Sequence, residues 1–200
     1  KGWMDSMYEE IERLTRALCA AHGTPGCEEE AFRAAEEALS FCDTVVTDAL
    51  GGVTGMLGDP NARRRILLDA HIDQIGLVVT NIDVYGSETL TGIVCTLPPH
   101  LAKGDGESIP PVSEQAVDVG LSREEAEKLV SVGDRAVLAN PLRKLLGSRI
   151  SGTALDDRAG CACIIRAAQL VRDKLSDCCV LVLCSTREEV GGQGARVRTY

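Results

Sequence analysis

Three short acidic clusters carry the residues of this chain that could do chemistry, and each ends an apolar run or is bounded by glycine. They are Ala70-His71-Ile72-Asp73, Leu155-Asp156-Asp157 and Glu188-Glu189. A carboxylate beside a buried strand must be paired, hydrogen-bonded or bound to a cation, so these clusters favour a divalent metal ion. Imidazole and carboxylate donors without sulfur suit zinc, cobalt or manganese. The sequence therefore predicts a metal site.

The spacing inside the clusters suggests how the roles divide. Residues two apart in a strand project from the same side, so we expect Asp73 to hydrogen-bond the non-ligating nitrogen of His71. Asp156 could bridge two ions about 3.5–4 Å apart. Of Glu188 and Glu189, one could bind metal while the other faces the attacking water as general base, and their spacing does not decide which is which.

Each cluster taken singly also has an ordinary structural interpretation. A His-x-Asp pair is commonly a surface or capping pair, Asp-Asp before a helix is commonly an N-cap, and Glu-Glu is commonly solvated. The coincidence of all three clusters in one chain is what favours a functional site.

The segments around the clusters predict an α/β fold, a mixed sheet with helices on both faces. Apolar residues at helical spacing predict a first helix that ends near His22, and a second helix runs from Glu28 to about Leu39. A further helix should follow Asp156. Strands are expected at 45–47, 53–57, 66–68 and 179–184, and the last two are continuous apolar runs typical of strands buried on both faces.

Between Ile75 and about Leu138 the sequence pattern changes to short β-rich runs separated by Gly, Pro and acidic turns. This pattern predicts a small inserted β domain. Within it, Ser122 stands three residues before Glu125, the spacing of a capping box that begins a short helix. The predicted organisation is a core domain in two parts, 1–73 and 150–200, interrupted by a β-rich domain at 74–149.

Composition narrows the class of protein. With 44% hydrophobic and 26% charged residues the chain should fold, and a net charge of −9 with scattered Lys and Arg argues against a nucleic-acid partner. Its first residues are amphipathic and acidic and its apolar runs are short, which predicts a cytoplasmic protein with no membrane partner. The nine cysteines are odd in number, and those in apolar segments are expected to be buried free thiols: Cys161, Cys163, Cys178, Cys179 and Cys184.

Read in order, these segments resemble the M42 family of metallo-aminopeptidases, which includes glutamyl and deblocking aminopeptidases. The resemblance covers nearly the whole chain and rests on these motifs: Gly26-Cys27-Glu28, Asp48-Ala49-Leu50-Gly51-Gly52-Val53, Asp69-Ala70-His71-Ile72-Asp73-Gln74-Ile75-Gly76, Ile93-Val94-Cys95-Thr96-Leu97-Pro98-Pro99-His100, Val117-Asp118-Val119-Gly120, Val132-Gly133-Asp134, Gly152-Thr153-Ala154-Leu155-Asp156-Asp157-Arg158-Ala159-Gly160 and Glu188-Glu189-Val190-Gly191-Gly192-Gln193-Gly194-Ala195.

The resemblance implies a co-catalytic aminopeptidase with two divalent ions per complete subunit, zinc or cobalt, with manganese possible. His71 and Glu189 would each ligate one ion, Asp156 would bridge them, and Asp73 would support His71. Glu188 would be the general base that takes a proton from the attacking water. The resemblance also implies peptide substrates and a homo-oligomer, in which the insertion from about Gln74 to Arg149 forms dimers that assemble into a hollow dodecamer.

Three departures from the family pattern bear on activity. Gln74 stands where the family commonly has Glu, and Asp157 where it commonly has Asn. The resemblance also places two further metal ligands downstream of Tyr200, so the chain by itself is expected to bind metal weakly and to be inactive. The alternatives are a related dinuclear carboxypeptidase or deacylase, and an inactive assembly protein.

Overall fold

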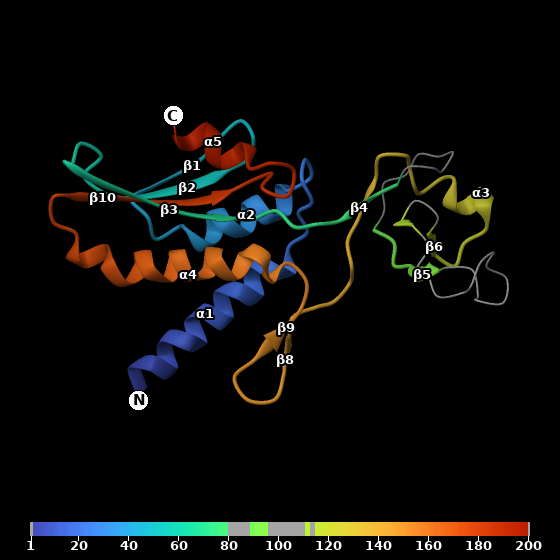
Figure 1. The fold of residues 1–200 in the computed structure, drawn as a ribbon, viewed down its shortest axis with the longest axis horizontal. Coiled ribbons are helices and arrows are strands. Elements are labelled where there is room, and N and C mark those ends of the chain that lie inside the picture. The colour runs from blue at the N-terminus through green and yellow to red at the C-terminus, as the bar shows by residue number, and fades with distance from the viewer. Residues whose placement is uncertain (1, 80–88, 96–110, 113–114, 200) are drawn as a thin grey trace. The chain divides into compact units, whose positions relative to one another are not determined.

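The computed structural model describes residues 2–79, 89–95, 111–112 and 115–199. The chain forms two compact units, Lys1–Gly76 with Val137–Tyr200, and Leu77–Ala136. The elements of Figure 1 are, in chain order, α1 (Gly2–Ala20), α2 (Glu29–Ala38), β1 (Thr44–Thr47), β2 (Val53–Gly58), β3 (Arg64–His71), β4 (Leu77–Val78), β5 (Ile93–Cys95), β6 (Ala116–Asp118), α3 (Arg123–Ala126), β7 (Arg135–Ala136), β8 (Arg143–Lys144), β9 (Ile150–Ser151), α4 (Leu155–Val171), the 3-10 helix η2 (Arg172–Lys174), β10 (Cys178–Ser185) and α5 (Gln193–Thr199).

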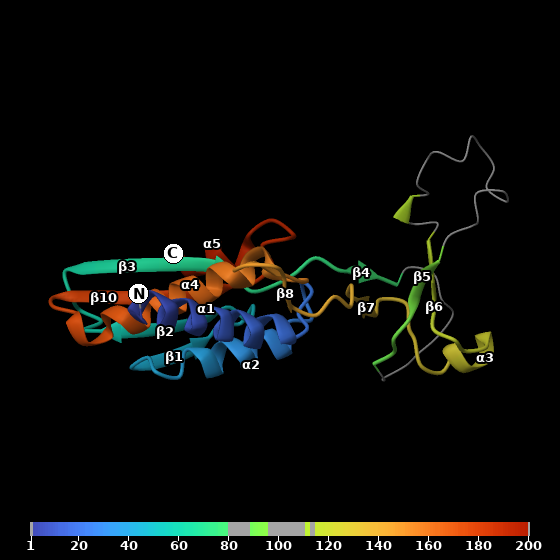
Figure 2. The same ribbon diagram turned by 90° about the horizontal axis from the view of Figure 1, so that it is seen from below.

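A four-stranded mixed sheet in the order β1-β2-β10-β3 forms the centre of the first unit. Strand β2 pairs antiparallel with both β1 and β10, whereas β10 and β3 run parallel. The helices α1, α2 and α4 cover one face of the sheet, and α5 lies on the other face (Figures 1 and 2). The expected α/β class, a mixed sheet with helices on both faces, is confirmed.

The hydrophobic core lies between the sheet and its three-helix layer. Alternate residues of β2 and β10 point into this layer, which is the period of a strand with one face on a core. The buried apolar side chains of the layer are Leu14, Leu18, Ala31, Ala35, Leu39, Val53, Leu57, Ala70, Ile72, Cys161, Ala162, Ile165, Ala168, Val180, Val182 and Cys184. The predicted first, second and fourth helices therefore form, and Leu14 and Leu18 of α1 pack as their apolar spacing indicates.

Two expectations about burial are wrong. Strand β3 is not buried on both faces, because it lies at an edge of the sheet and leaves Ile66 48% and Leu67 38% exposed. A continuous apolar run does not distinguish an edge strand from a central one. Of the five cysteines expected to be buried, Cys163 is exposed on the outer side of α4 and Cys178 is half-buried, although all nine cysteines lie in the described part and are free thiols.

The second unit, Leu77–Ala136, contains two short antiparallel pairs, β4 with β7 and β5 with β6. The predicted capping box is present, since Ser122 Oγ accepts from the Glu125 amide while the Glu125 carboxylate accepts from the Ser122 amide. Within the β-rich region, residues 80–88 and the motif residues 96–100 lie outside the described residues.

The boundaries between the two compact units lie at 76/77 and 136/137. The domain boundaries expected at 73/74 and 149/150 stay a prediction. The β8–β9 hairpin accounts for the offset, because Arg16 of α1 donates a hydrogen bond to the Leu142 carbonyl at 3.1 Å and Lys144 pairs with Glu12 at 3.5 Å. In the part of the chain that the structure describes, no helix is long and apolar enough to cross a membrane.

Candidate metal centre

The parallel pairing of β3 and β10 brings two of the three acidic clusters together. In this register His71, the last residue of β3, lies opposite Ser185, the last residue of β10. The chain continues from Ser185 to Glu188 and Glu189. The imidazole and both glutamates therefore lie at the same edge of the sheet, where the carboxyl ends of β3 and β10 meet. The carboxyl ends of parallel strands are where ligands commonly bind in α/β sheets.

A tight turn after β10 holds the two glutamates in place. The amides of Gly191 and Gly192 donate to the Glu188 carbonyl at 2.9 and 3.1 Å, and the Gly194 amide donates to the Thr186 carbonyl at 3.0 Å. Gly191 and Gly192 have φ values of +113° and +67°, a backbone region that side chains disfavour. The glycines after Glu189 are therefore required for the turn that presents the carboxylates.

Asp73 fixes this turn from the segment that follows the neighbouring strand β3. Its carboxylate is fully buried and accepts the Glu188 amide on Oδ1 at 3.0 Å and the Glu189 amide on Oδ2 at 3.2 Å. One carboxylate thus satisfies two main-chain donors that would otherwise be orphaned beside the site. The spacing of the residues gave no sign of this contact, because the partners are more than 100 positions apart.

His71 is held from both of its ring nitrogens. Nδ1 lies 3.2 Å from the main-chain carbonyl oxygen of Asp73 and 3.6 Å from that residue's carboxylate, so the hydrogen-bond partner is the carbonyl rather than the side chain we expected. The chain leaves the strand after His71, and the two-residue period no longer holds there. Nε2 points into the site and lies 3.2 Å from Asp156 Oδ1.

Asp156 reaches the site from the start of α4. It and Asp157 have non-helical backbone angles, so the regular helix begins after them, and the peptide bond between them is cis. The Asp156 side chain is 91% exposed and contacts His71, whereas the Asp157 carboxylate turns back to accept the Gly160 amide at 3.1 Å. Only the first of the two aspartates is therefore directed toward the imidazole.

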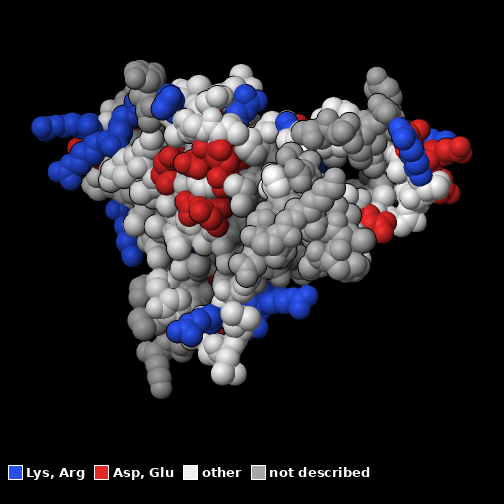
Figure 3. All heavy atoms as spheres, turned by 45° about the vertical axis from the view of Figure 1, so that its right-hand side comes forward, with Lys and Arg blue, Asp and Glu red and all other residues white. Residues whose placement is uncertain are grey.

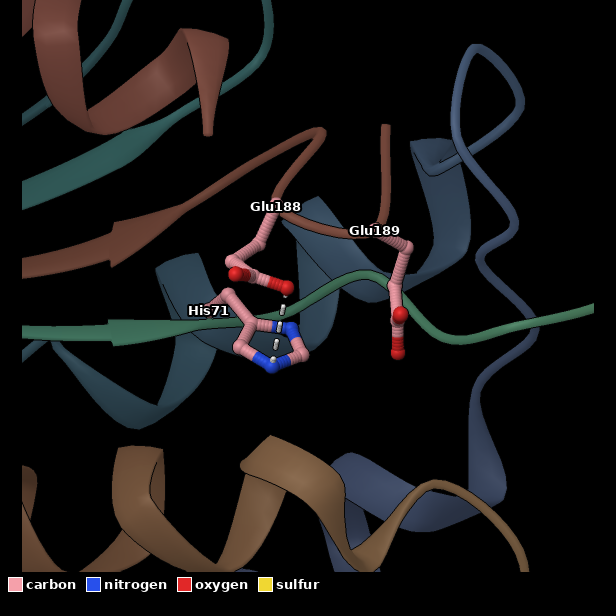
Figure 4. Close-up of side chains that lie close together, drawn as sticks. All are labelled: His71, Glu188 and Glu189. Atoms are coloured by element: carbon pink, nitrogen blue, oxygen red, sulfur yellow. Dashed lines mark ion pairs between the residues drawn. The ribbon is translucent and has the colours of Figure 1, made fainter. Parts of the chain in front are cut away.

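The donor set fits a divalent cation. His71, Glu188 and Glu189 each offer a ligand atom, and these atoms all lie within 4.8 Å of one another. Figure 4 shows the Glu188 carboxylate beside the imidazole, with 3.8 Å between Oε2 and Nε2, and Glu189 on the adjacent side. Figure 3 shows acidic side chains gathered in one compact group on a face of the molecule. Nitrogen and carboxylate ligands at such a concentration of negative charge are those that zinc or cobalt accept.

The pKa shifts at the site follow from this concentration of carboxylates. Burial disfavours the imidazolium form of His71, but the carboxylates of Asp73, Asp156 and Glu188 outweigh burial and raise the pKa of His71. Desolvation, followed by repulsion from Asp73 and Glu188, raises the pKa of Glu189 against the attraction of His71. The raised pKa of His71, and the repulsive contributions to the pKa of Glu189, are those of a site with excess negative charge that a cation would neutralise.

Two buried charged residues beside the site were missed at the level of sequence. Glu28 is 2% exposed and accepts the Gly26 amide at 2.7 Å and the Thr186 hydroxyl, which connects the loop after α1 to the segment that carries the glutamates. Arg158 is fully buried. Its signal is present in the sequence, because Arg158 falls on the stripe of α4 that also buries Cys161 and Ile165.

Comparison with known proteins decides the family. A sequence model described as M42 glutamyl aminopeptidase matches residues 84–200. The lysyl aminopeptidase of Pyrococcus furiosus is 32% identical over 188 residues, which cover 79% of this chain and 53% of that enzyme. The chain belongs to the M42 glutamyl aminopeptidase family. The fold agrees with this, because solved structures of M42-like peptidases superpose on nearly the whole chain.

Two of those structures illustrate the similarity. The TET aminopeptidase of a marine sediment archaeon of the Thaumarchaeota has a TM-score of 0.83 at 27% identity, with 95% of this chain and 62% of that chain covered. The TET1 peptidase of Pyrococcus horikoshii, which can assemble into a tetrahedron or a large octahedral shell, has a TM-score of 0.78 at 27% identity, with 96% and 64% covered. This M42 chain thus spans 53% to 64% of the length of these relatives.

Proposed function

We propose that this chain carries the first part of the catalytic centre of a metal-dependent aminopeptidase, which removes amino-terminal residues from peptides. The observation that carries the proposal is the parallel register of β3 and β10, which sets His71 and Ser185 opposite each other and gathers His71, Glu188 and Glu189 within 4.8 Å. No ordinary packing requirement explains one imidazole and two carboxylates directed into a common space at a sheet edge.

The roles that we propose follow the geometry and the family resemblance. His71 and Glu189 would each hold one ion, and Asp156, with its carboxylate 3.2 Å from the imidazole, would hold both. Bound zinc, cobalt or manganese ions would supply Lewis acidity toward the substrate carbonyl and lower the pKa of water.

Glu188 acts as general base: its carboxylate takes a proton from the attacking water and passes it to the leaving amine. Its side chain is 54% exposed and close to His71, which leaves it accessible to a substrate. Asp73 accepts the main-chain amides of both glutamates and so fixes the position of Glu188, the base, relative to Glu189, the metal ligand.

The complete protein is proposed to be a homo-oligomer whose second unit contributes to the contacts. This rests on the shells formed by the Pyrococcus horikoshii relative and on exposed apolar side chains of the β5–β6 pair, where Ile93 is 73% and Val94 46% exposed. Exposed apolar side chains that lie next to one another are typical of association surfaces.

The test uses the full-length protein, stripped of metal and reconstituted with zinc, cobalt or manganese. We expect about two ions per subunit, chelator-sensitive release of p-nitroaniline from aminoacyl anilides, and no cleavage of the same substrates when their amino group is acetylated. Cleavage of N-acylated substrates instead would favour the related deacylase or carboxypeptidase. Metal-free protein without hydrolase activity would favour an assembly role.

The 200-residue chain by itself makes a second, independent test. Because the resemblance assigns two further ligands to the downstream part of the family, we expect weak metal binding and no peptidase activity from residues 1–200 alone. Two tight sites in a calorimetric titration of this chain would contradict that expectation.

A further inference from the structure

Arg158 is the largest side chain that the described structure buries completely, with 0% exposure. It begins the regular part of α4, directly after Asp156 and Asp157. A guanidinium group removed from water needs acceptors for its donors, and its desolvation is costly when it lacks them. The acceptors that it finds therefore indicate what this buried cation does.

The guanidinium binds main-chain carbonyls of two separate segments. Nη1 donates to the carbonyls of Leu18, at 2.7 Å, and Ala21, at the end of α1. Helix α1 has no basic residue in its own last turn, so Arg158 supplies a cation at this C-terminus, where the Leu18 carbonyl also accepts the Ala21 amide at 3.3 Å. Nε donates to the carbonyl of Ile72 at 2.9 Å, and this second contact leads to the metal centre.

Ile72 lies between His71 and Asp73, and both of its main-chain polar groups are bonded. Its amide donates to the Ser185 carbonyl at 2.8 Å, and its carbonyl accepts from Arg158. Its side chain is fully buried. The peptide units that set the directions of His71 and Asp73 are thus held by β10 on one side and by α4 on the other.

The charges of Arg158 and Asp73 complement each other inside the protein. Asp73 is fully buried and uses its carboxylate oxygens for the amides of Glu188 and Glu189. Burial lowers the pKa of the Arg158 guanidinium, and the Asp73 carboxylate is among the groups that oppose this shift. The Asp73 carboxylate thus offsets part of the cost of burying the Arg158 cation.

We propose that Arg158 is a positioning residue of the metal centre. It ties the Ile72 main chain to the start of α4, so that His71 and Asp156, which are 85 positions apart, present their donor atoms to the same space. The inference rests on the proposed metal-dependent function and adds a residue that touches neither the ions nor the substrate.

The substitution that tests this is Arg158→Lys in the full-length protein. Lysine keeps the positive charge but cannot bind two separate segments with a planar fork of donors. The matched control is Arg166→Lys, the same chemical change two turns further along α4, where Arg166 Nη1 bonds Gln169 Oε1 of the same helix at 3.0 Å. A second variant, Gly23→Ala, keeps the arginine but disturbs its position: the added Cβ would lie 2.9 Å from Arg158 Nη2, and also 2.8 Å from the Ala31 Cβ of α2.

Two measurements separate positioning from mere stabilisation. In metal-free protein, we expect hydrogen exchange of the Ile72, Glu188 and Glu189 amides to accelerate about tenfold or more in Arg158→Lys, relative to the amides of the β1–β2 pair. With cobalt, we expect the affinity to fall about 10- to 100-fold and the visible absorption spectrum to change, as for other residues that orient metal ligands. Arg166→Lys should change neither measurement.

The outcomes are distinct. If wild-type protein takes up no cobalt, the proposed function fails, and the exchange of the three amides still decides whether Arg158 positions this segment. If Arg158→Lys speeds exchange uniformly and leaves the cobalt affinity and spectrum as in wild type, Arg158 only stabilises the end of α1 and the inference is overturned. Should Arg158→Lys fail to fold, Gly23→Ala must show the same local pattern at smaller amplitude.

Discussion

Two regions of the molecule differ in how their side chains are bonded. One is the edge of the sheet where β3 and β10 end, and the other is the β5–β6 pair of the second unit. At the sheet edge, buried charged side chains bind main-chain groups of other segments: Asp73 accepts two amides, and Arg158 donates to three carbonyls through Nε and Nη1, although its buried Nη2 has no partner in the described part of the chain. In the β5–β6 pair, every residue is exposed, including apolar Ile93, Val94 and Val117. The first arrangement holds atoms in defined positions, and the second offers apolar area. We infer that chemistry and association are assigned to different units of the chain.

The largest expected effect tests whether chemistry is confined to the sheet edge. In the full-length protein, Glu188→Gln should lower kcat by about 10² to 10⁴, because an amide cannot accept the proton of the attacking water. Metal content should stay at the wild-type level. The measurement is steady-state hydrolysis of an aminoacyl anilide, with ion content determined in parallel. Glu124→Gln, the same change at an exposed position of α3 in the second unit, should leave kcat unchanged.

A buried acceptor at the site should matter far more than an exposed one in the second unit. Asp73→Asn leaves one of the two glutamate amides facing an NH₂ group, so we expect the free energy of unfolding to fall by about 1–3 kcal/mol. Urea unfolding of metal-free protein measures it. The control is Asp118→Asn, where an exposed carboxylate accepts the Gly120 amide at 2.8 Å, and a change below about 0.5 kcal/mol is expected.

Association should depend on the second unit. Val94 and Val117 are cross-strand neighbours, 46% and 48% exposed, and Val94→Asp would place a charge on the apolar pair. We expect the association constant of the full-length protein to fall on the order of a hundredfold, measured by light scattering over a dilution series. Val46→Asp is the control, since Val46 of β1 is 52% exposed in the first unit. An unchanged oligomer for Val94→Asp would contradict the assigned role of β5–β6.

The first unit contains two hydrogen bonds from a threonine hydroxyl to a glutamate carboxylate, one buried and one at the surface, and their contributions to stability can be compared. Thr186→Val removes the hydroxyl that donates to buried Glu28, and we expect a loss of about 1–2 kcal/mol in unfolding free energy. Thr47→Val removes the matching hydroxyl that donates to Glu36 at the surface, where water replaces it, and should cost less than about 0.5 kcal/mol. If thermal or urea unfolding shows equal losses of unfolding free energy for the two variants, the buried Glu28 hydrogen bond stabilises the protein no more than the exposed one.

The smallest expected effect is a pH dependence of the metal-free protein. The raised pKa of His71 means that folding favours the imidazolium form. The stability it contributes is fully present below the unfolded value near 6.5 and is lost as the pH rises through the folded value. Urea unfolding at several pH values above about 6 should show this decline. The decline should vanish in His71→Asn and persist in His22→Asn, and its persistence in His71→Asn would contradict the assignment.

Part of the fold follows from local patterns in the sequence, because apolar residues of α1 recur at helical spacing and Leu14 and Leu18 become its buried stripe. Helix α4 also forms where it is expected, but which of its faces is buried depends on the packing of the whole layer. The capping box at Ser122 was equally predictable, since it depends on two residues of one turn. The burial of β3 was not. Whether an apolar strand is central or at an edge depends on which other strands pair with it, and β10 alone does so among the described residues.

For the site, the sequence determined the kinds of donor and their positions after apolar runs: an imidazole, carboxylates and the glycines of the last turn. Tertiary structure decided how they meet. The register that places His71 opposite Ser185, the two amides bound by Asp73, and the burial of Arg158 against Ile72 all join segments about 85 to 115 positions apart. Local periodicity reports only which face of an element is apolar, whereas pairing across such distances depends on the combined burial of the whole core.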